Sequence, residues 1–147
     1  MSGPLIEDRT FDELTAGQLH DLLRLRVDVF VVEQQCAYPE IDGLDTVPTS
    51  RHVWIAGPNS GPKAYLRIVD DGSTRRIGRV VVTPDARSEG LARALVDYAI
   101  ATYPGPWELD AQTYLAGWYR RLGFEESGPE FIDYGVPHVP MRQDAAR

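Results

Sequence analysis

Residues 77–103 read IGRVVVTPDARSEGLARALVDYAIATY, and this stretch decides the fold. Its apolar, β-branched beginning predicts a strand over 77–83. Leucines and alanines then recur at helical spacing and predict a helix over 91–103. A second strand, WELDA, is predicted over 107–111. The three elements form a strand–helix–strand unit, in which the strands are parallel and the crossover is right-handed.

The segments on both sides add further strands and helices to this unit. They are a helix that opens over 14–19, a strand hairpin over 52–56 and 63–70 with its turn at 57–62, a short helix over 113–124 and strand-like segments over 131–141. Thr15 and Gln18 form a capping box at the first of these helices. The mixed order of elements predicts an α/β fold whose sheet has antiparallel and parallel parts.

The composition predicts one globular domain over residues 1–147, with 43% hydrophobic and 25% charged residues. A formal net charge of −7 argues against nucleic-acid binding and favours a cationic substrate. No apolar run approaches the roughly 18 residues that span a bilayer, so we expect no membrane segment. The N-terminal residues have no secretory signal pattern, and Cys36 is the one cysteine, which together predict a cytoplasmic protein.

The segment RSEGLA (87–92) lies where the predicted strand passes into the predicted helix. The first amides of a helix have no partner within the helix and attract anions. Gly90 and Ala92 keep side-chain bulk away from these amides, and Arg87 adds a cation. The pattern fits a phosphate site, but it also fits an ordinary strand–helix turn with a surface arginine.

Four segments, taken in order, form a more specific pattern. They are LRVDVFVVEQQCAYPEIDGLD (25–45), GRVVVTPDARSEGLARALV (78–96), LDAQTYLAGWYRRLGF (109–124) and GVPHVPM (135–141). Together they resemble the ElaA-like family of the GNAT superfamily of N-acetyltransferases. The resemblance implies the GNAT acyl-CoA N-acyltransferase fold, a mixed central sheet with splayed strands and flanking helices.

The resemblance also implies an acetyl-CoA site where the strands over 77–83 and 107–111 splay apart. The pyrophosphate contacts would be Arg87, Ser88, Glu89, Gly90, Leu91 and Ala92. The main chain of Val80 and Val82 would pair with the pantetheine arm. The N–H of Val81 or Val82 would polarise the acyl carbonyl if the strand has the bulge usual in this superfamily. Gln112 is the remaining predicted contact, at a position where many members have asparagine.

Two residues are predicted to be catalytic. Acyl transfer to an amine requires a neutral amine and a proton for the leaving thiolate. Tyr119 is the predicted proton donor, because it aligns with the tyrosine that the superfamily places near the coenzyme sulfur; a core tyrosine beside Trp118 and Phe124 is the alternative. Glu33 is the predicted base or amine binder, because it follows four apolar residues, where partial burial would raise its pKa. A structural carboxylate is the other interpretation.

Three further residues are weaker candidates for substrate binding. His52 and His138 are the other titratable candidates, and either could relay a proton near neutral pH, although a single histidine is more often structural. Asp42 belongs to an acidic loop that is either a solvated turn or a rim that attracts amines. The widely spaced histidines and the single cysteine show no metal-ligand pattern, so we expect no metal.

The predicted function is therefore transfer of an acetyl group from acetyl-CoA to a small-molecule or peptide amine. The sequence allows a homodimer. Two alternatives remain open at this point. One is a non-catalytic acyl-CoA-binding or interaction protein with the same fold. The other is an acyltransferase like the acyl-homoserine-lactone synthases, which the segment RVDVFVVEQ and the acidic loop after it also resemble.

Overall fold

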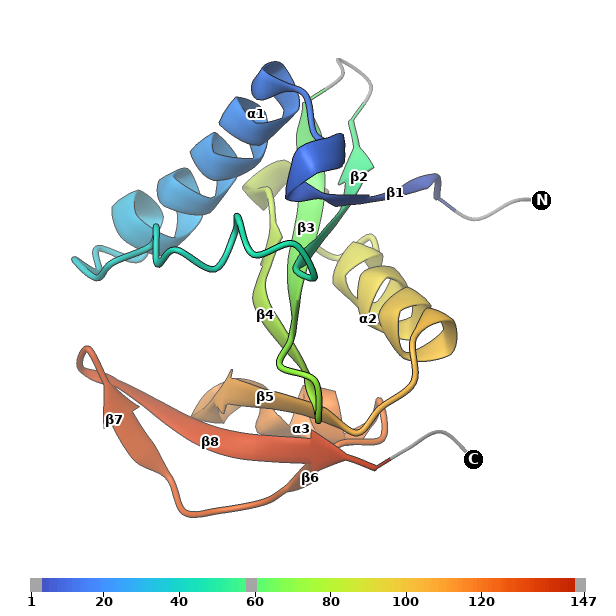
Figure 1. The fold of residues 1–147 in the computed structure, drawn as a ribbon. Coiled ribbons are helices and arrows are strands. Elements are labelled where there is room, and N and C mark those ends of the chain that lie inside the picture. The colour runs from blue at the N-terminus through green and yellow to red at the C-terminus, as the bar shows by residue number, and fades with distance from the viewer. Residues whose placement is uncertain (1–3, 58–60, 145–147) are drawn as a thin grey trace.

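The computed structural model describes residues 4–57 and 61–144 (Figure 1). Within these residues, eight strands form one sheet in the order β1-β2-β3-β4-β5-β8-β6, and β7 pairs with β8. The strands are β1 (Ile6–Thr10), β2 (Arg51–Ala56), β3 (Pro62–Asp70), β4 (Arg75–Val82), β5 (Trp107–Gln112), β6 (Glu125–Glu126), β7 (Phe131–Asp133) and β8 (Val136–Gln143). Only β4 and β5 run parallel among the strand pairs of these described residues. The predicted mixed sheet is confirmed.

Three α-helices flank the sheet in the described residues. They are α1 (Ala16–Arg26), α2 (Leu91–Thr102) and the short α3 (Ala116–Arg120), with 3₁₀ turns η1 (Phe11–Glu13), η3 (Pro84–Ala86) and η4 (Thr113–Leu115). Side chains alternate along a strand, so Val53 and Ile55 of β2 pack in the cluster that includes α2, whereas Trp54 packs in the cluster with α1. α1 and α2 therefore lie on opposite faces (Figure 1).

The start of α1 follows the predicted capping box. The amide of Gln18 donates to the Thr15 hydroxyl, and the amide of Thr15 donates to the Gln18 side chain, each at 3.0 Å. At its other end, α1 continues directly into a π-helix, η2 (Val27–Glu33). π-helical turns are rare and occur frequently at functional sites. Glu33, the last residue of η2, is positioned by this wider turn.

The parallel strands β4 and β5 separate after a short paired stretch. Arg75 pairs with Trp107 and Arg76 pairs with Glu108, and no further β4–β5 pair follows in the described residues. β5 instead pairs along its whole length with β8. The sheet thus divides into one half formed by β1–β4 and another formed by β5–β8 (Figure 1).

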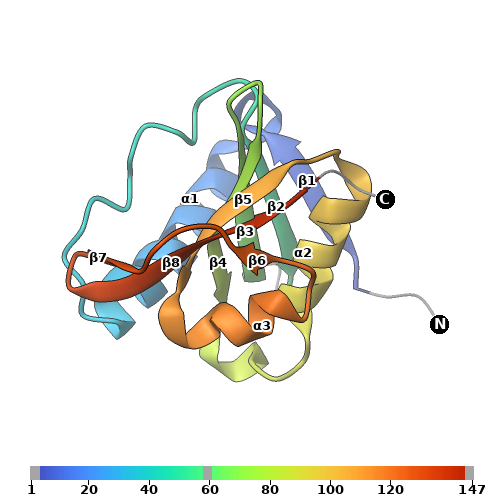
Figure 2. The ribbon, with the colours of Figure 1, turned by 90° about the horizontal axis from the view of Figure 1, so that it is seen from below.

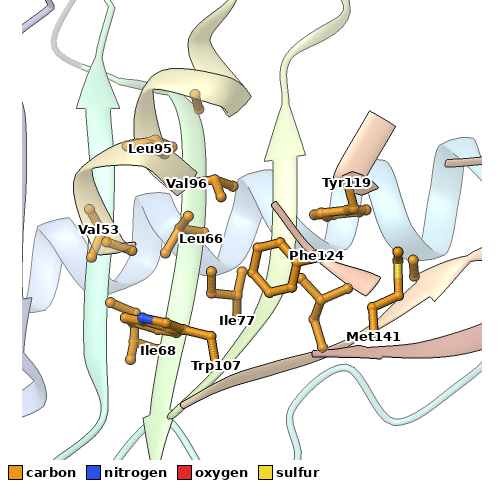
Figure 3. Close-up of a cluster of buried hydrophobic side chains, with 14 of the residues drawn as sticks. Val53, Leu66, Ile68, Ile77, Leu95, Val96, Trp107, Tyr119, Phe124 and Met141 are labelled. Carbon is orange, nitrogen blue, oxygen red and sulfur yellow. The ribbon is translucent and has the colours of Figure 1, made fainter. Parts of the chain in front are cut away.

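One core joins the two halves although their strands separate. Trp107, Phe124 and Met141 from the second half belong to the same buried cluster as residues of β2, β3, β4 and α2. Figure 3 shows these side chains beside Leu66 and Ile77 of the first half. Apolar burial of this kind supplies most of the favourable free energy of folding.

One predicted element differs from the structure, and another is confirmed. The helix predicted over 113–124 is shorter, because η4 and the five residues of α3 replace a continuous helix, although Gly123 ends the segment with φ at +100°, as a helix-terminating glycine does. The hairpin of β2 and β3 is confirmed as antiparallel. Part of its predicted turn, residues 58–60, lies outside the described residues.

Candidate active site

A cleft of about 800 Å³ opens where β4 and β5 separate. Residues 77–82 of β4 form one wall, and residues 109–112 of β5 form the other. Side chains from η2, the loop after it, the first turn of α2, α3 and the β7–β8 hairpin close the remaining sides. The volume lies within the range of about 300–1,000 Å³ that is typical of small-molecule sites.

A β-bulge interrupts the β4 wall. Tyr65 pairs with Val81, and Arg67 pairs with Gly78. Between these two pairs, β3 has one residue and β4 has two. Arg79 has φ at +55°, a conformation that residues other than glycine seldom adopt. The bulge implied by the resemblance is therefore present, and it lies within the stretch of β4 that lines the cleft.

The phosphate segment predicted at residues 87–92 leads into α2. Gly90 is the N-cap of α2 and has φ at +76°, which glycine adopts without strain. The Gly90 carbonyl accepts the first hydrogen bond of the helix, from the amide of Ala94. The amides of residues 91–93 therefore have no partner within the helix. A Cβ at Gly90 would meet no atom within 4 Å, so the space beside the glycine is open. Arg87 and Ala92 line the cleft, whereas residues 88–91 are not among its lining residues.

Arg87 forms an ion pair with Glu33. The guanidinium donates to the two carboxylate oxygens of Glu33 at 2.7 and 2.9 Å and to the carbonyl of Val82 at 3.1 Å. The hydrogen bonds from Arg87 lower the pKa of Glu33. The expectation of a partly buried Glu33 with a raised pKa is wrong, because its side chain is 42% exposed and has a cationic partner.

Tyr119 lies on α3 at the inner side of the cleft. Tyr119 is only 7% exposed, and its ring packs edge-on against Trp118 and Phe124 at centroid distances of 4.8 and 6.0 Å. Figure 3 shows Tyr119 and Phe124 in the core. Burial raises the pKa of Tyr119 to about 12, so the hydroxyl stays protonated at neutral pH. Both interpretations of Tyr119 are therefore compatible with its position: it is a core residue, and it lines the cleft.

His138 lines the cleft from β8, directly opposite Gln112 of β5. Its Nδ1 lies 2.8 Å from the carbonyl of Val136, and its ring stacks on Phe131 at 5.7 Å. A carbonyl only accepts hydrogen bonds, so Nδ1 holds the proton in the neutral ring. Nε2 then has the free lone pair, which makes His138 able to accept a proton.

Known proteins are similar to this chain in sequence and in fold. Residues 24–145 match the family model described as an acetyltransferase (GNAT) domain. The chain belongs to the GNAT acetyltransferase family. The UPF0039 protein Rv2851c of Mycobacterium tuberculosis is 43% identical over 134 residues, which cover 88% of this chain and 86% of that protein.

Two solved structures have the same fold along nearly the whole GNAT domain. Escherichia coli ElaA superposes with a TM-score of 0.89 at 33% identity, covering 97% of this chain and 100% of the other. An acyl-CoA N-acyltransferase from Pseudomonas aeruginosa superposes with a TM-score of 0.88 at 34% identity, covering 96% and 99%. These similarities confirm the predicted fold and the resemblance to ElaA.

Two predicted substrate-binding residues of this GNAT domain do not line the cleft. His52 is buried, with Nδ1 2.7 Å from the Tyr65 hydroxyl and Nε2 3.0 Å from the carbonyl of Asp45. Burial lowers the pKa of His52. Asp42 accepts from Arg67 at 2.8 and 3.0 Å; burial acts to raise its pKa, but the hydrogen bonds outweigh burial and lower the pKa to about 2. Both residues stabilise the loop after η2.

The loop is held by a cluster of ion pairs with a buried centre at Arg26, Glu40, Asp45 and Arg67. Its members are Arg26, Glu40, Asp42, Asp45, Arg67 and Arg79. Arg26 has no exposed side-chain surface and donates to Glu40 at 2.6 Å and Asp45 at 2.8 Å. With three arginines and three carboxylates, the cluster is neutral and fixes the loop beside the β4 bulge.

Several residues that line the cleft were not predicted from the sequence. They include Cys36 and Tyr38 from the loop after η2 and Asp133 and Tyr134 from the β7–β8 hairpin. One sequence signal was available: Tyr134-Gly135 separates two strand-like segments, and both residues have positive φ, as a tight hairpin turn requires. Nothing in the sequence near this turn indicates that it contacts the loop after η2, about 100 residues earlier.

Two features are absent from residues 4–57 and 61–144. None of their helices is both long and apolar enough to cross a membrane. No group of three or more histidine, cysteine, aspartate or glutamate side chains in this part of the chain is arranged to hold a metal ion.

Proposed function

We propose that this protein transfers an acetyl group from acetyl-CoA to the amine of a small molecule or peptide. The observation on which this proposal rests is the cleft between β4 and β5, with the unpaired first amides of α2 at one end and Tyr119 on its inner side. Membership of the GNAT acetyltransferase family supports the reaction class. The similar P. aeruginosa protein is described as an acyl-CoA N-acyltransferase, which supports the choice of an acyl-CoA donor.

The residues at the start of α2 fit a phosphate group. The amides of residues 91–93 have no partner within the helix and lie at the positive end of its dipole. Arg87 is close enough to add a cation, and Gly90 leaves open space. Residues 77–82 of β4 pair with β3 but have no partner on the side of β5. This free edge would hold the extended arm of the coenzyme through backbone hydrogen bonds from Val80 and Val82.

The coenzyme, when bound, supplies an acyl thioester. The amine nitrogen forms a bond to the acyl carbon, the carbon–sulfur bond breaks, and one proton leaves nitrogen while one is added to sulfur. Tyr119 would donate the proton to sulfur, because its hydroxyl is protonated at neutral pH and the residue lines the cleft. The backbone N–H groups at the bulge, from Val81 or Val82, would stabilise the charge that develops on the acyl oxygen.

His138 is a better candidate than Glu33 for the base that accepts the amine proton. Its Nδ1 is committed to the carbonyl of Val136, which leaves Nε2 as the acceptor. The carboxylate of Glu33 has a lowered pKa and is engaged by Arg87, so it is a weak base. We assign Glu33 the role of holding Arg87 beside the phosphate segment.

The two candidates for the base are separated by a pair of variants. His138→Gln is expected to lower kcat at pH 7 by about 10², the low end of the range for general base catalysis. Glu33→Gln is expected to change kcat by less than about twofold. Steady-state thiol release at several pH values, with thermal melting to verify folding, measures both. If Glu33→Gln lowered kcat more than His138→Gln does, Glu33 would be the base instead.

The phosphate segment is tested by placing a negative charge in it. Ala92→Glu is expected to weaken coenzyme A binding by about tenfold or more, because a carboxylate would repel the phosphate at close range. The fold should persist, since an acidic residue in the first turn of a helix is favourable. Ala101→Glu makes the same change at an exposed site near the other end of α2 and serves as the control. Calorimetric titration with equal affinities for the two variants would refute the phosphate site.

Thiol release also separates an enzyme from a non-catalytic binding protein. A catalyst consumes acetyl-CoA faster in the presence of an amine acceptor, and Tyr119→Phe removes this increase. A chain that binds coenzyme A but shows no increase with any amine tested would be a binding protein.

A further inference from the structure

The end of the cleft opposite the phosphate segment is formed by two segments that are distant in the sequence. The Cys36 thiol lies 3.9 Å from the carbonyl of Tyr134, and the rings of Tyr38 and Tyr134 are 6.0 Å apart. The loop after η2 therefore lies beside the turn of the β7–β8 hairpin (Figure 2). If the coenzyme phosphates occupy the α2 end, this opposite end receives the acceptor.

The charged groups along the cleft leave one carboxylate available to a cation. Three acidic residues line the cleft, of which Glu33 pairs with Arg87 and Asp110 pairs with Arg76 at 2.9 Å. Asp133 is exposed and has no ion pair within the described residues. The acceptor end thus offers one negative charge.

The remaining surface at this end is aromatic and apolar. Phe131 and His138 are stacked and directly opposed across the β7–β8 hairpin, and the Tyr134 ring is 58% exposed at the turn. One face of Tyr38 is already covered by Arg79, whose guanidinium lies 5.5 Å from the ring centroid. Tyr134 is therefore the ring available to an incoming molecule.

Asp133 and His138 share one face of the hairpin. Phe131 pairs with His138 and Asp133 pairs with Val136, and side chains two residues apart on a strand point to the same side. An ammonium group attracted by Asp133 is thus brought next to the proposed base. Transfer of one proton from the ammonium to Nε2 of His138 gives the neutral amine. Release of that proton to solvent returns His138 to the neutral form, which accepts the second proton as the amine attacks the thioester.

We propose that the acceptor is a primary amine with a single positive charge attached to an aromatic or apolar body, as in an arylalkylamine. This inference rests on the proposed function and specifies its substrate class. One carboxylate compensates one ammonium, and the exposed ring of Tyr134 provides apolar contact for the rest of the molecule. A polycation would place its further charges against apolar surface and against Arg79 and Arg87.

The experiment compares three amines as acceptors for the full-length chain at saturating acetyl-CoA. Phenethylamine combines one charge with an aromatic ring, n-butylamine keeps the charge without the ring, and spermidine has several charges. We expect kcat/KM for thiol release to be highest with phenethylamine. Equal or higher values with spermidine would overturn the acceptor class while leaving the proposed function in place.

Two variants test the proposed roles of Asp133 and Tyr134 in binding the amine. Asp133→Asn is expected to raise KM for phenethylamine by about two- to fivefold without changing kcat, as the loss of an exposed charge pair does. Glu130→Gln removes a neighbouring carboxylate that does not line the cleft and should leave KM unchanged. Tyr134→Asn should raise KM for phenethylamine but not for n-butylamine, and asparagine suits the positive φ of this turn position.

The outcomes distinguish the two proposals. Unchanged KM in Asp133→Asn and Tyr134→Asn overturns the acceptor inference. Coenzyme A binding without turnover of phenethylamine also overturns it. Absence of coenzyme A binding to the unaltered chain refutes the proposed function itself, which the calorimetric titration detects independently of any amine.

Discussion

Tyr119→Phe is expected to lower kcat by about 10²–10⁴ while coenzyme affinity stays within about twofold of the original. The variant loses the hydroxyl that would protonate the leaving sulfur, and the loss of one general acid costs a factor in this range. The ring remains, so its edge-on contacts with Trp118 and Phe124 are retained. The hydroxyl has no hydrogen-bond partner among the described residues, so its removal should not lower the melting temperature.

For Tyr119→Phe, thiol release measures kcat, and calorimetric titration measures coenzyme affinity. Tyr98→Phe is the matched control. Tyr98 lies on α2, away from the cleft, and the substitution removes a hydroxyl that donates to Asp8 at 2.7 Å. Its kcat should be unchanged. If Tyr119→Phe had the kcat of the unaltered chain, Tyr119 would be a packing residue and solvent would supply the proton.

Arg26→Leu is expected to lower the free energy of unfolding by about 3–5 kcal/mol, as the removal of one partner from a buried ion pair does. Arg26 is the buried cation between Glu40 and Asp45. After its removal, each carboxylate keeps one arginine, Arg79 and Arg67 respectively, but loses a hydrogen bond that balances its desolvation.

Urea denaturation gives the free energy of unfolding of Arg26→Leu and of a control, Arg24→Leu, which changes the same helix. Arg24 is 74% exposed and lies 3.8 Å from Asp28, so its loss should cost about 0.5 kcal/mol or less. The large difference follows from burial, since both substitutions remove an arginine from α1. Equal stabilities of the two variants would show that the cluster contributes no more than a surface pair.

The sequence alone predicts the parts of the fold that depend on local pattern. The β4–α2–β5 unit follows from periodicity, and the capping box at Thr15 and Gln18 follows from spacing. The start of α2 at Leu91 also agrees with the helix predicted over 91–103, and the structure adds the positive φ of its N-cap, Gly90. These features need no knowledge of distant residues.

The parts that were missed depend on contacts between distant residues. Glu33 follows four apolar residues, which suggests burial, but the π-helix ends there and the side chain meets Arg87, 54 positions later. Asp42 belongs to an acidic loop that looks solvated, yet it pairs with Arg67 and Arg79 on neighbouring strands. Which charges pair is decided by the sheet, and the sequence does not show it.

The Arg87–Glu33 ion pair makes coenzyme binding an exchange of one anion for another. In the proposed function, a phosphate that engages Arg87 competes with a carboxylate already held at 2.7 Å. Dissolved salt weakens the resident pair and the incoming attraction alike, because both partners of the pair are more than 40% exposed. Coenzyme affinity should therefore fall less steeply with ionic strength than it would at an arginine without a resident anion.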